Sequence, residues 1–383
     1  MRNFIFASMY KQSNKPKNTM KARYTLLFIS SIIISSLFLQ SCDAKKPAVG
    51  EEDLIYVVAD SSEYYELEAA LLQVFGKIIY TPQPENLFDI KRVSVNRLDE
   101  VKNKKNIIIT APLNSGSYTS QYINSILDST VKNMIESESD FVINKYDMWA
   151  RDQLVSILTA PDIEKLNQQI LTNHENLLYY FQKISDKRLF QSLYNEKYEQ
   201  KDIEAKLLDQ YGWIIYVQAD FLLAQDSPED KFVWLRRAPG TDMERWIFVH
   251  WIDDASPNFL EKDSIYAQRN KMTSKHFVTI DNSSRVEIAD SYISTKEVNF
   301  LGRYALMTQG LWRMDDKSMG GPFINYTFYD EASKRIYMLD GSIYAPKYYK
   351  KRLLQQVDVL LQSFMTKDQL SEDKIDDLLS RLK

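Results

Sequence analysis

The sequence predicts an α+β protein with two folded halves, and three observations lead to this class. In the first half, short apolar runs alternate with stretches of helical spacing in the order β-α-β-β-α-β, which is that of a ferredoxin-like fold. In the second half, strand-like segments follow one another at short intervals, which favours a mostly antiparallel sheet backed by helices. Tyr and Phe are abundant, with 24 and 18 residues, as is typical of strands.

The first 41 residues have the features of a signal region. A basic segment begins with its own Met20, which we take as the translation start, and an apolar run covers residues 24–39. This run is too short and too rich in Ser for a membrane-spanning helix, but it suits the core of a signal peptide. It ends in Leu39-Gln40-Ser41-Cys42, the pattern at which bacterial lipoproteins are cleaved and acylated.

Cys42 is the only cysteine of the chain. We expect cleavage just before it, acylation with chains such as palmitate, and membrane lipid as a direct binding partner. An acylated Cys42 leaves no thiol, which excludes disulfides, Cys-based zinc sites and a Cys nucleophile. The expected location is the cell envelope, with the outer membrane favoured over the inner one.

Charge and composition narrow the classes of function. Six of the 48 Lys and Arg residues and none of the 52 acidic residues precede Cys42, so the rest of the chain has a formal net charge of −10. Binding to nucleic acid needs a basic footprint, and no nucleic-acid partner is therefore expected. A hydrophobic content of 44% and a charged content of 26% indicate a folded protein rather than a disordered one.

Four segments are predicted after the signal region. Residues 42–53 are polar and form a tether, residues 54–200 form the ferredoxin-like half, residues 201–365 form the half with the antiparallel sheet, and residues 366–383 hold a C-terminal helix.

In the first half, residues 54–59 form a short apolar run that we predict as a strand. Asp60 and Glu63 are expected to form a capping box for the following helix, which Gly76 ends. The remaining elements predicted here are strands at 90–95, 106–111 and 141–160, the last one bent near Trp149, and helices at 63–75, 118–136 and 162–198.

In the second half, a helix at 202–211 ends at Gly212, a weak helical pattern covers 264–274, and a clear amphipathic one covers 348–364. A short helix is predicted at 371–383. The predicted strands are 214–223, 232–236, 246–251, 277–280, 303–312, 323–329 and 335–343.

Motifs that carry known chemistry are missing from the sequence. His174, His250 and His276 have none of the spacings of a zinc site, and we interpret them as ordinary surface or core residues. The sequence contains no phosphate-binding loop and no Gly-x-Ser-x-Gly elbow, and its 10 glycines make backbone cradling of a nucleotide improbable. We expect no metal and no cofactor, and we assign no catalytic residue.

Carboxylates keep one enzymatic alternative open. Asp147, Asp152, Asp315 and Asp316 lie close to tryptophans in the sequence. A glycosidase needs two carboxyl groups about 5–10 Å apart beside aromatic platforms. A hydrolase of envelope polysaccharide or peptide would therefore need at least two of these four in one cleft, with a raised carboxyl pKa. The other interpretation is that they are solvated turn residues.

The most distinctive stretch is Met319-Gly320-Gly321-Pro322-Phe323. Gly-Gly-Pro permits a backbone course that other residues do not adopt, and we predict a tight turn that leads into a strand. The same freedom would let a ligand or partner approach the backbone. Lys350-Lys351-Arg352 opens the last long helix, where basic residues oppose the helix dipole, so we expect them to pair with acids of the sheet or to bind an anion.

Several of these motifs together resemble a family of uncharacterised envelope lipoproteins that is known only as a domain of unknown function. The resemblance covers nearly all of the chain after Cys42 and implies an envelope lipoprotein, but it implies no activity and no functional residues. It rests on Trp149-Ala150 with Gln153, Phe232-Val233-Trp234-Leu235-Arg236, Gly310-Leu311-Trp312, Met319-Gly320-Gly321-Pro322-Phe323, and Tyr344-Ala345-Pro346 with Lys351-Arg352.

We therefore predict a non-enzymatic envelope lipoprotein that binds a protein or glycan partner in an assembly or maintenance role. An exposed aromatic patch would support this prediction. The alternatives are the hydrolase and a small-ligand carrier, which needs a closed apolar cavity of about 300–1,000 Å³. The candidate binding residues are Trp149, Trp234, Arg236, Trp312, Gly320, Gly321, Phe323 and Arg352.

Overall fold

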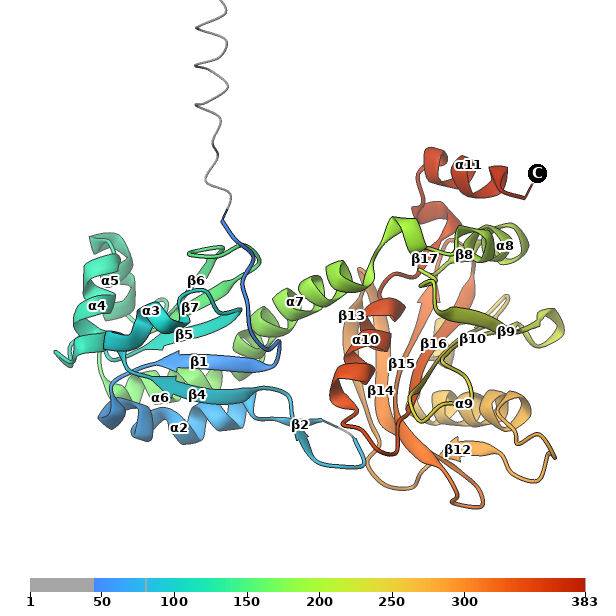
Figure 1. Ribbon diagram of the computed structural model, residues 1–383, viewed down its shortest axis with the longest axis horizontal. Helices are drawn as coiled ribbons and strands as arrows, with labels where there is room; N and C mark the ends of the chain where they lie inside the picture. The colour runs from blue at the N-terminus through green and yellow to red at the C-terminus, as the bar shows by residue number, and fades with distance from the viewer. Residues whose placement is uncertain (1–44, 80, 383) are drawn as a thin grey trace, which may run out of the picture. The chain divides into compact units, whose positions relative to one another are not determined.

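The computed structural model describes residues 45–79 and 81–382, and the chain divides into two units, Met1–Lys46 and Pro47–Lys383. The predicted signal region and Cys42 lie outside the described residues. The second unit contains a mixed sheet and a larger antiparallel sheet, each packed against helices (Figure 1), so the predicted α+β class is confirmed. Among the described residues, no helix has both the length and the apolar character needed to cross a membrane.

The first sheet has five strands in the order β4-β1-β5-β7-β6, and only β6 runs antiparallel to its neighbour. Every residue of β5 and β7 is buried, as expected for parallel strands that are covered on both faces. The bounds of the strands are Leu54–Val58 (β1), Asp89–Val93 (β4), Asn106–Thr110 (β5), Val142–Tyr146 (β6) and Leu154–Leu158 (β7).

The ferredoxin-like topology predicted for this half is wrong. A ferredoxin-like sheet is antiparallel, whereas β1 pairs in parallel with both β4 and β5. Residues 141–160 were predicted as one bent strand, but left-handed backbone at Asp147 and Asp152 (φ 55° and 59°) turns them into the hairpin of β6 and β7. Strands buried on both faces show continuous apolar runs without alternation, so their direction is not readable from the sequence.

Helices cover both faces of the first sheet (Figure 1). Side chains of α2, α6 and α7 pack with Ile55 and Val57 of β1, while α4 and α5 pack with Val58 and Ile109 on the other face. The bounds of the helices are Ser61–Phe75 (α2), Leu98–Val101 (α3), Tyr118–Ile126 (α4), Ser129–Glu136 (α5), Ile163–Thr172 (α6) and His174–Leu193 (α7).

Two helix boundaries in this half differ from those predicted. The predicted helix at 162–198 is interrupted at Asn173, between α6 and α7. The predicted capping box at the start of α2 does not form. The Asp60 carboxylate instead accepts the N–H of Tyr118 (3.0 Å) and the hydroxyl of Thr119 (2.9 Å) at the start of α4, and so joins two helices.

The second sheet has eight strands and is antiparallel throughout, which confirms the prediction for this half. Its order is β12-β14-β15-β16-β11-β10-β9, with β13 also paired to β14. The bounds are Phe221–Ser227 (β9), Phe232–Arg237 (β10), Glu244–Ile252 (β11), Val286–Ile288 (β12), Ser294–Phe300 (β13), Arg303–Met314 (β14), Gly320–Asp330 (β15) and Arg335–Tyr344 (β16).

The predicted strand at 277–280 is wrong, because this segment follows a helix and makes a single bridge between Val278 and Arg285. Polar β13 was not predicted. Helix α9 packs on one face of the sheet and α10 on the other. The helices of this half are Lys201–Tyr211 (α8), Lys262–His276 (α9), Lys351–Leu361 (α10) and Glu372–Ser380 (α11). The short elements are the strands Ile78–Ile79 (β2), Glu85–Asn86 (β3), Trp213–Ile214 (β8) and Met365–Thr366 (β17), with 3₁₀ turns at Val95–Arg97 (η1), Glu196–Tyr198 (η2), Pro228–Asp230 (η3), Pro257–Phe259 (η4) and Lys367–Gln369 (η5).

A buried ion pair fixes α9 on the sheet. Arg269 of α9 and Asp340 of β16 are both completely buried, with Arg269 Nε 2.7 Å from Asp340 Oδ2. The same carboxylate accepts hydrogen bonds from Ser342 Oγ (2.8 Å) and Asn325 Nδ2 (3.1 Å). The guanidinium carbon lies 3.6 Å from the centre of the Phe323 ring. The charge of Arg269 is therefore balanced by one carboxylate inside the protein.

We expect the substitution Asp340→Ala to lower the free energy of unfolding by about 3–5 kcal/mol, because it leaves the buried Arg269 guanidinium without a counter-charge. Urea unfolding followed by tryptophan fluorescence measures this change. Asp99→Ala is the control, since Asp99 pairs with Lys102 (2.8 Å) on the exposed surface and such pairs contribute about 1 kcal/mol or less. Equal losses in both variants would contradict the role given to the buried pair.

Candidate functional site

Three of the predicted binding residues lie together between the second sheet and α9. Trp234, Trp312 and Phe323 belong to one hydrophobic cluster, which we call the aromatic cluster and which also contains Trp246 and Phe277. The rings of Trp246 and Trp312 are 4.8 Å apart, and those of Trp234 and Phe277 are 4.4 Å apart. Trp312 and Phe323 are fully buried, so neither offers its ring to an external partner.

Arg236 and Trp234 form the outer edge of the aromatic cluster, where both side chains are half-buried. The Arg236 guanidinium lies 4.8 Å from the centre of the Trp234 ring, and its Nη2 donates to Glu244 Oε2 (2.6 Å). Trp234 Nε1 and Arg236 Nε have no hydrogen-bond partner among the described residues. Both nitrogen atoms are buried, although the two side chains as a whole are partly exposed, and buried donors without acceptors are uncommon in folded proteins.

Gly320 and Gly321 do not form the predicted turn, because they already lie in β15 and neither has a positive φ. Their small size is required by close packing of the backbone. A Cβ on Gly321 would lie 1.9 Å from the carbonyl oxygen of Ile343, and one on Gly320 would lie 2.8 Å from that of Trp312. The turn itself is formed by the four residues that precede Met319, where Lys317 has a φ of 64°.

Trp149 and Arg352 lie away from the aromatic cluster. Trp149 is in the turn between β6 and β7, half-buried against the first sheet, and its backbone N–H donates to Gln153 Oε1 (3.0 Å). Arg352 is exposed on α10. Its neighbour Lys351 pairs with an acid just before the first sheet and not within a strand, because Lys351 Nζ lies 2.5 Å from Asp53 Oδ2.

The four predicted carboxylates occupy two turns in different halves. Asp147 and Asp152 lie between β6 and β7, where Asp152 pairs with Lys187 (3.2 Å). Asp315 and Asp316 lie between β14 and β15. Hydrogen bonds from the hydroxyl of Ser284 and from Ser318 lower the pKa of Asp315 and Asp316, respectively. The hydrolase alternative needs a raised carboxyl pKa, and these two residues do not provide it.

The histidines have structural surroundings. His250 is buried with its Nδ1 2.9 Å from the carbonyl oxygen of Lys231, and burial lowers its pKa to about 4. His276 stacks on Phe232 with ring centres 4.1 Å apart, and His174 is exposed at the start of α7. In residues 45–79 and 81–382, no group of three or more His, Cys, Asp or Glu side chains is arranged to hold a metal ion.

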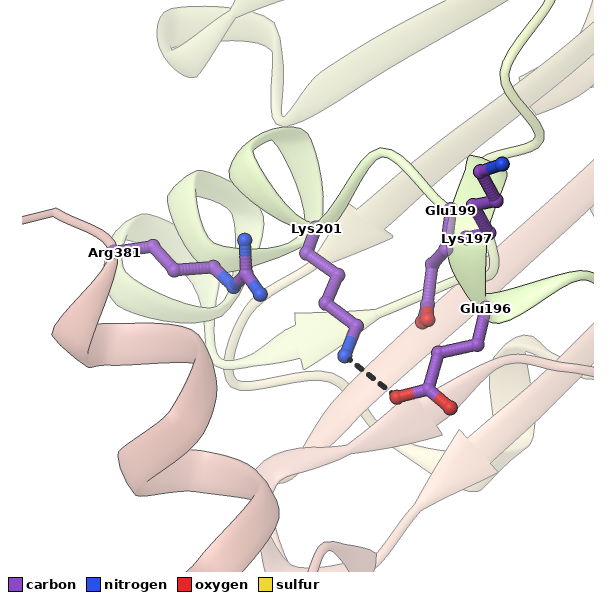
Figure 2. Close-up of a pocket in the computed structure, with 5 residues that line it drawn as sticks. All are labelled: Glu196, Lys197, Glu199, Lys201 and Arg381. Atoms are coloured by element: carbon purple, nitrogen blue, oxygen red, sulfur yellow. Dashed lines mark hydrogen bonds and ion pairs between the residues drawn. The ribbon is translucent and has the colours of Figure 1, made fainter.

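The structure shows a candidate site that the sequence analysis missed. An open cavity of about 480 Å³ lies beside η2 and the start of α8, and its lining residues come from the segment 196–201 and from the C-terminal segment (Figure 2). The lining residues are Glu196, Lys197, Glu199, Lys201 and Arg381. Lys201 Nζ donates to Glu196 Oε1 (3.2 Å) across the cavity wall.

Glu199 forms a carboxyl pair with Glu204 behind this cavity. Glu204 is 1% exposed, and the side chain of Glu199 is 3% exposed. Glu204 Oε1 accepts the N–H of Val217 (3.0 Å), while Glu199 Oε1 accepts from Lys374 Nζ of α11 (3.2 Å). Burial, with the charge of Glu199, raises the pKa of Glu204 to about 8. The raised pKa favours the protonated form of Glu204 beside Glu199, whose Oε2 has no hydrogen-bond partner among the described residues.

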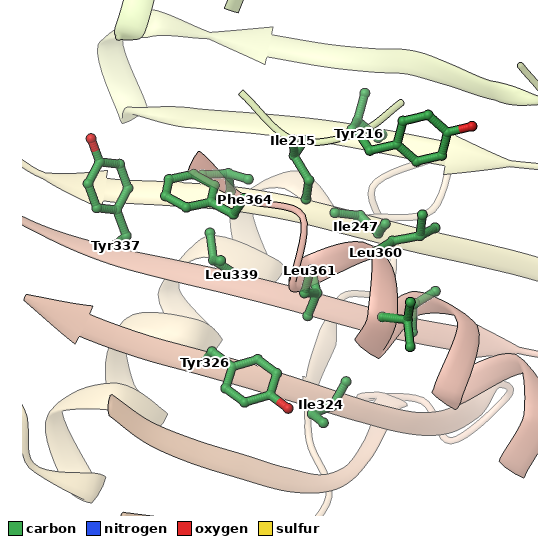
Figure 3. Packing of buried hydrophobic residues seen from close by; sticks show 14 of the residues in the cluster. Ile215, Tyr216, Ile247, Ile324, Tyr326, Tyr337, Leu339, Leu360, Leu361 and Phe364 are labelled. Atoms are coloured by element: carbon green, nitrogen blue, oxygen red, sulfur yellow. The ribbon is translucent and has the colours of Figure 1, made fainter. Parts of the chain in front are cut away.

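A second carboxyl pair joins α7 to α10. Burial, with the charge of Asp358, raises the pKa of Asp186 to about 8. Asp358 Oδ1 accepts the hydroxyl proton of Tyr326 (2.7 Å), and burial raises its pKa as well. Figure 3 shows Tyr326 on β15, among the apolar side chains that α10 contributes to the core. A carboxyl group kept neutral by its surroundings can serve as a general acid, but only the first pair adjoins a cavity described here.

A sequence signal for both pairs existed. Glu204 falls at the helical spacing of Leu207, Leu208 and Tyr211, so it occupies the inner face of its helix. Asp358 stands in the same relation to Leu354 and Leu361. An acidic residue on the apolar face of a helix indicates a buried carboxyl group. The predicted carboxylates were instead chosen because they lie near tryptophans in the sequence.

Comparisons with known proteins identify two uncharacterised regions in this chain. Residues 199–363 match the family described as "Domain of unknown function (DUF4837)", and residues 48–194 match the one described as "Domain of unknown function (DUF8532)". The prediction of uncharacterised domains is thus confirmed, while neither match tests lipidation. No curated protein matches the chain.

Two solved structures overlap with parts of the fold. A protein from Bacteroides thetaiotaomicron VPI-5482 shares 7% identity with a TM-score of 0.25, over 43% of this chain and 47% of that protein, so the chain spans about half of its length. The Ran-binding protein Mog1p of Saccharomyces cerevisiae shares 11% identity with a TM-score of 0.27, over 41% of this chain and 90% of that protein. Similarities of this size carry neither fold nor function to the chain.

The raised pKa of Glu204 gives the stability a definite pH dependence. Between its ordinary value of 4.5 and about 8, the folded state holds a proton that the unfolded state has lost. The free energy of unfolding therefore falls as the pH rises through this window, by at most about 1.4 kcal/mol per pH unit for one proton. Glu204→Gln keeps the hydrogen bonds without a titrating proton, so we expect it to flatten the dependence.

Urea unfolding at pH 5, 6, 7 and 8 measures this effect as the difference between the wild type and Glu204→Gln. Asp186 contributes equally to the pH dependence of both proteins, so its contribution cancels in the difference. Glu196→Gln is the matched control, because Glu196 lines the same cavity but is exposed, and it should retain the wild-type slope. Parallel slopes for all three proteins would contradict a shared proton at Glu204.

Proposed function

We propose that this chain is a lipoprotein of the bacterial cell envelope, anchored through acylated Cys42, which binds a protein or glycan partner and does not itself catalyse a reaction. The observation that carries the anchor is Leu39-Gln40-Ser41-Cys42, with the only cysteine of the chain at the end of an apolar run. Two or three acyl chains, each with about 0.8 kcal/mol per buried CH₂, hold a protein on a bilayer without a spanning helix.

The binding role is supported by the edge of the aromatic cluster. Trp234 and Arg236 present a flat ring and a guanidinium side by side, and both keep a nitrogen without an acceptor in the described part of the chain. Trp and Arg supply much of the binding energy in protein interfaces, and an aromatic ring also stacks on sugar faces.

In-cell crosslinking tests the proposal. Purification of the acylated protein after crosslinking should recover one or two dominant partners, and Cys42→Ala should lose both the acylated N-terminal peptide in mass spectra and those partners. Trp234→Phe, which keeps an aromatic ring but reduces its contact area, should reduce the recovered partner by about fivefold or more, the effect of losing about 1 kcal/mol of binding energy.

Tyr292→Phe is the control for Trp234→Phe, because Tyr292 is 64% exposed and its substitution should leave recovery unchanged. An unmodified N-terminal peptide in the wild type would refute the anchor. Equal partner recovery from wild type and Trp234→Phe would refute the assigned binding edge.

One observation favours a second candidate function, the hydrolysis of envelope polysaccharide or peptide. The raised pKa of Glu204 favours a neutral carboxyl group beside Glu199, which lines a cavity, and such a pair can supply a general acid and a base. Because both side chains are almost fully buried, a substrate would reach them only after neighbouring residues move. Release of soluble fragments from purified cell-wall material by the wild type, and its loss in Glu204→Gln, would establish this function.

A further inference from the structure

Backbone hydrogen bonds fix the beginning of the folded unit, directly after the N-terminal segment. The N–H of Ala48 donates to the carbonyl of Arg151 (2.8 Å), and that of Val49 donates to the carbonyl of Asn103 (2.9 Å). Lys105 in turn donates its N–H to the carbonyl of Val49 (3.2 Å). These bonds begin inside the segment predicted as a tether (42–53). The chain from Pro47 onward is therefore part of the fold.

Rigid attachment leaves a short distance to the proposed anchor. Five residue steps separate Cys42 from Pro47, and a chain covers at most about 3.5 Å per residue. If Cys42 is acylated, the backbone at Pro47 lies within about 18 Å of the lipid surface. The surface around Pro47 is thus kept close to the headgroups, within one or two screening lengths of about 8–10 Å.

Three loops surround this point. They precede the parallel strands β1, β5 and β7, which all begin at the same end of the first sheet (Figure 1). Tyr146 is 52% exposed, Val49 is 46% exposed, and Trp149 is half-buried. The side chain of Arg151 is 60% exposed. Aromatic rings beside Lys and Arg are typical of surfaces that lie at the headgroup level of a bilayer.

The charges near this point differ in sign from the rest of the chain. Asp152 is shared by Arg151 (3.6 Å) and Lys187 (3.2 Å). Glu52 is likewise shared by two cations, Lys105 (2.8 Å) and Arg188 (2.5 Å). Lys104 has no ion-pair partner in the described part of the chain. Apart from Asp53 and Lys351, which pair and cancel, the charged residues of the three loops and their ion-pair partners are Glu51, Glu52, Asp99, Lys102, Lys104, Lys105, Asp147, Arg151, Asp152, Lys187 and Arg188.

These eleven groups carry a surplus of one positive charge, and Lys45 and Lys46 precede them directly in the sequence, whereas the chain from Cys42 onward carries −10. Each basic residue near an anionic membrane contributes about 1 kcal/mol of attraction. An acidic protein whose anchored edge is locally basic is therefore oriented by the field of anionic headgroups, with its other surfaces repelled.

We propose that the surface formed by Val49, Lys102, Lys104, Tyr146, Trp149 and Arg151, here called the basal surface, rests on the phospholipid headgroups of the membrane that Cys42 anchors. This inference rests on the proposed lipidation. It gives Trp149 a role in membrane contact and leaves the edge at Trp234 and Arg236 for a partner.

Quenching by lipids that carry a spin label in the headgroup tests the basal surface. The acylated full-length protein is reconstituted into vesicles of phosphatidylethanolamine and phosphatidylglycerol, and a fluorophore is attached to a cysteine introduced as Asn103→Cys, the only free thiol once Cys42 is acylated. The control is Ile280→Cys, at a fully exposed position in the second half. We expect at least threefold stronger quenching at position 103 than at position 280.

Charge reversal supplies the second arm of the test. Adding Lys104→Glu and Arg151→Glu should reduce the quenching at position 103 to the control level on phosphatidylglycerol vesicles, with an unchanged thermal melt showing that the fold is intact. Mass spectrometry of the N-terminal peptide is run on every sample. An unacylated Cys42 refutes the proposed anchor itself. With Cys42 acylated, equal quenching at the two positions, or quenching that charge reversal leaves unchanged, overturns the basal surface while the lipoprotein proposal stands.

Discussion

The second half of the chain depends on the buried pair between Arg269 and Asp340. Helix α9 buries only two hydrophobic side chains, Ile265 and Met272, so apolar contact alone gives it little reason to dock. The Arg269 guanidinium stacks on Phe323 and forms an ion pair with Asp340. These contacts are directional, so they fix the position of α9 on the sheet, which apolar contact alone would not do. A buried pair gains little net stability over apolar packing but penalises wrong placements strongly, because any other register leaves a charge unpaired.

A second constraint on the fold is the close packing around one backbone atom, the carbonyl oxygen of Ile343. Trp312 Nε1 donates to it (3.2 Å), and only a residue without a side chain fits at Gly321, where a Cβ would come within 1.9 Å. The distinctive sequence from Met319 to Phe323 therefore places a tryptophan and a strand against one carbonyl group. The same contact holds Trp312 against Trp246 and so positions the aromatic cluster up to its edge at Trp234. The motifs that look functional in the sequence are thus largely structural, and the surface residues beside them face the solvent.

The sequence predicted the elements of the second half better than those of the first for a physical reason. Strands β14, β15 and β16 follow one another along the chain and are joined by short turns, so their pairing is local. In the first half, β1 pairs with β4 and β5, which begin only at Asp89 and Asn106. No local sequence pattern indicates partners at such a separation. The break at Asn173 and the hairpin at Asp147 each depend on one residue whose backbone leaves the regular course. Of the carboxyl pairs, the sequence indicates only Glu204 and Asp358, as acids on apolar helix faces, and the surroundings that raise their pKa form only in the folded chain.

The two carboxyl pairs bear on the choice between binding and catalysis. Each lies where elements distant in the sequence meet, since Glu199 accepts a hydrogen bond from Lys374 of α11, and Asp186 of α7 faces Asp358 of α10. Holding a proton at each pair removes a buried negative charge from a protein that already carries an excess of them, which lowers the cost of bringing these elements together. A catalytic acid must in addition meet its substrate, and the Glu204 side chain is enclosed by Val217 on one side and Glu199 on the other. In this enclosed position the proton at Glu204 stabilises the junction and is not presented to a substrate.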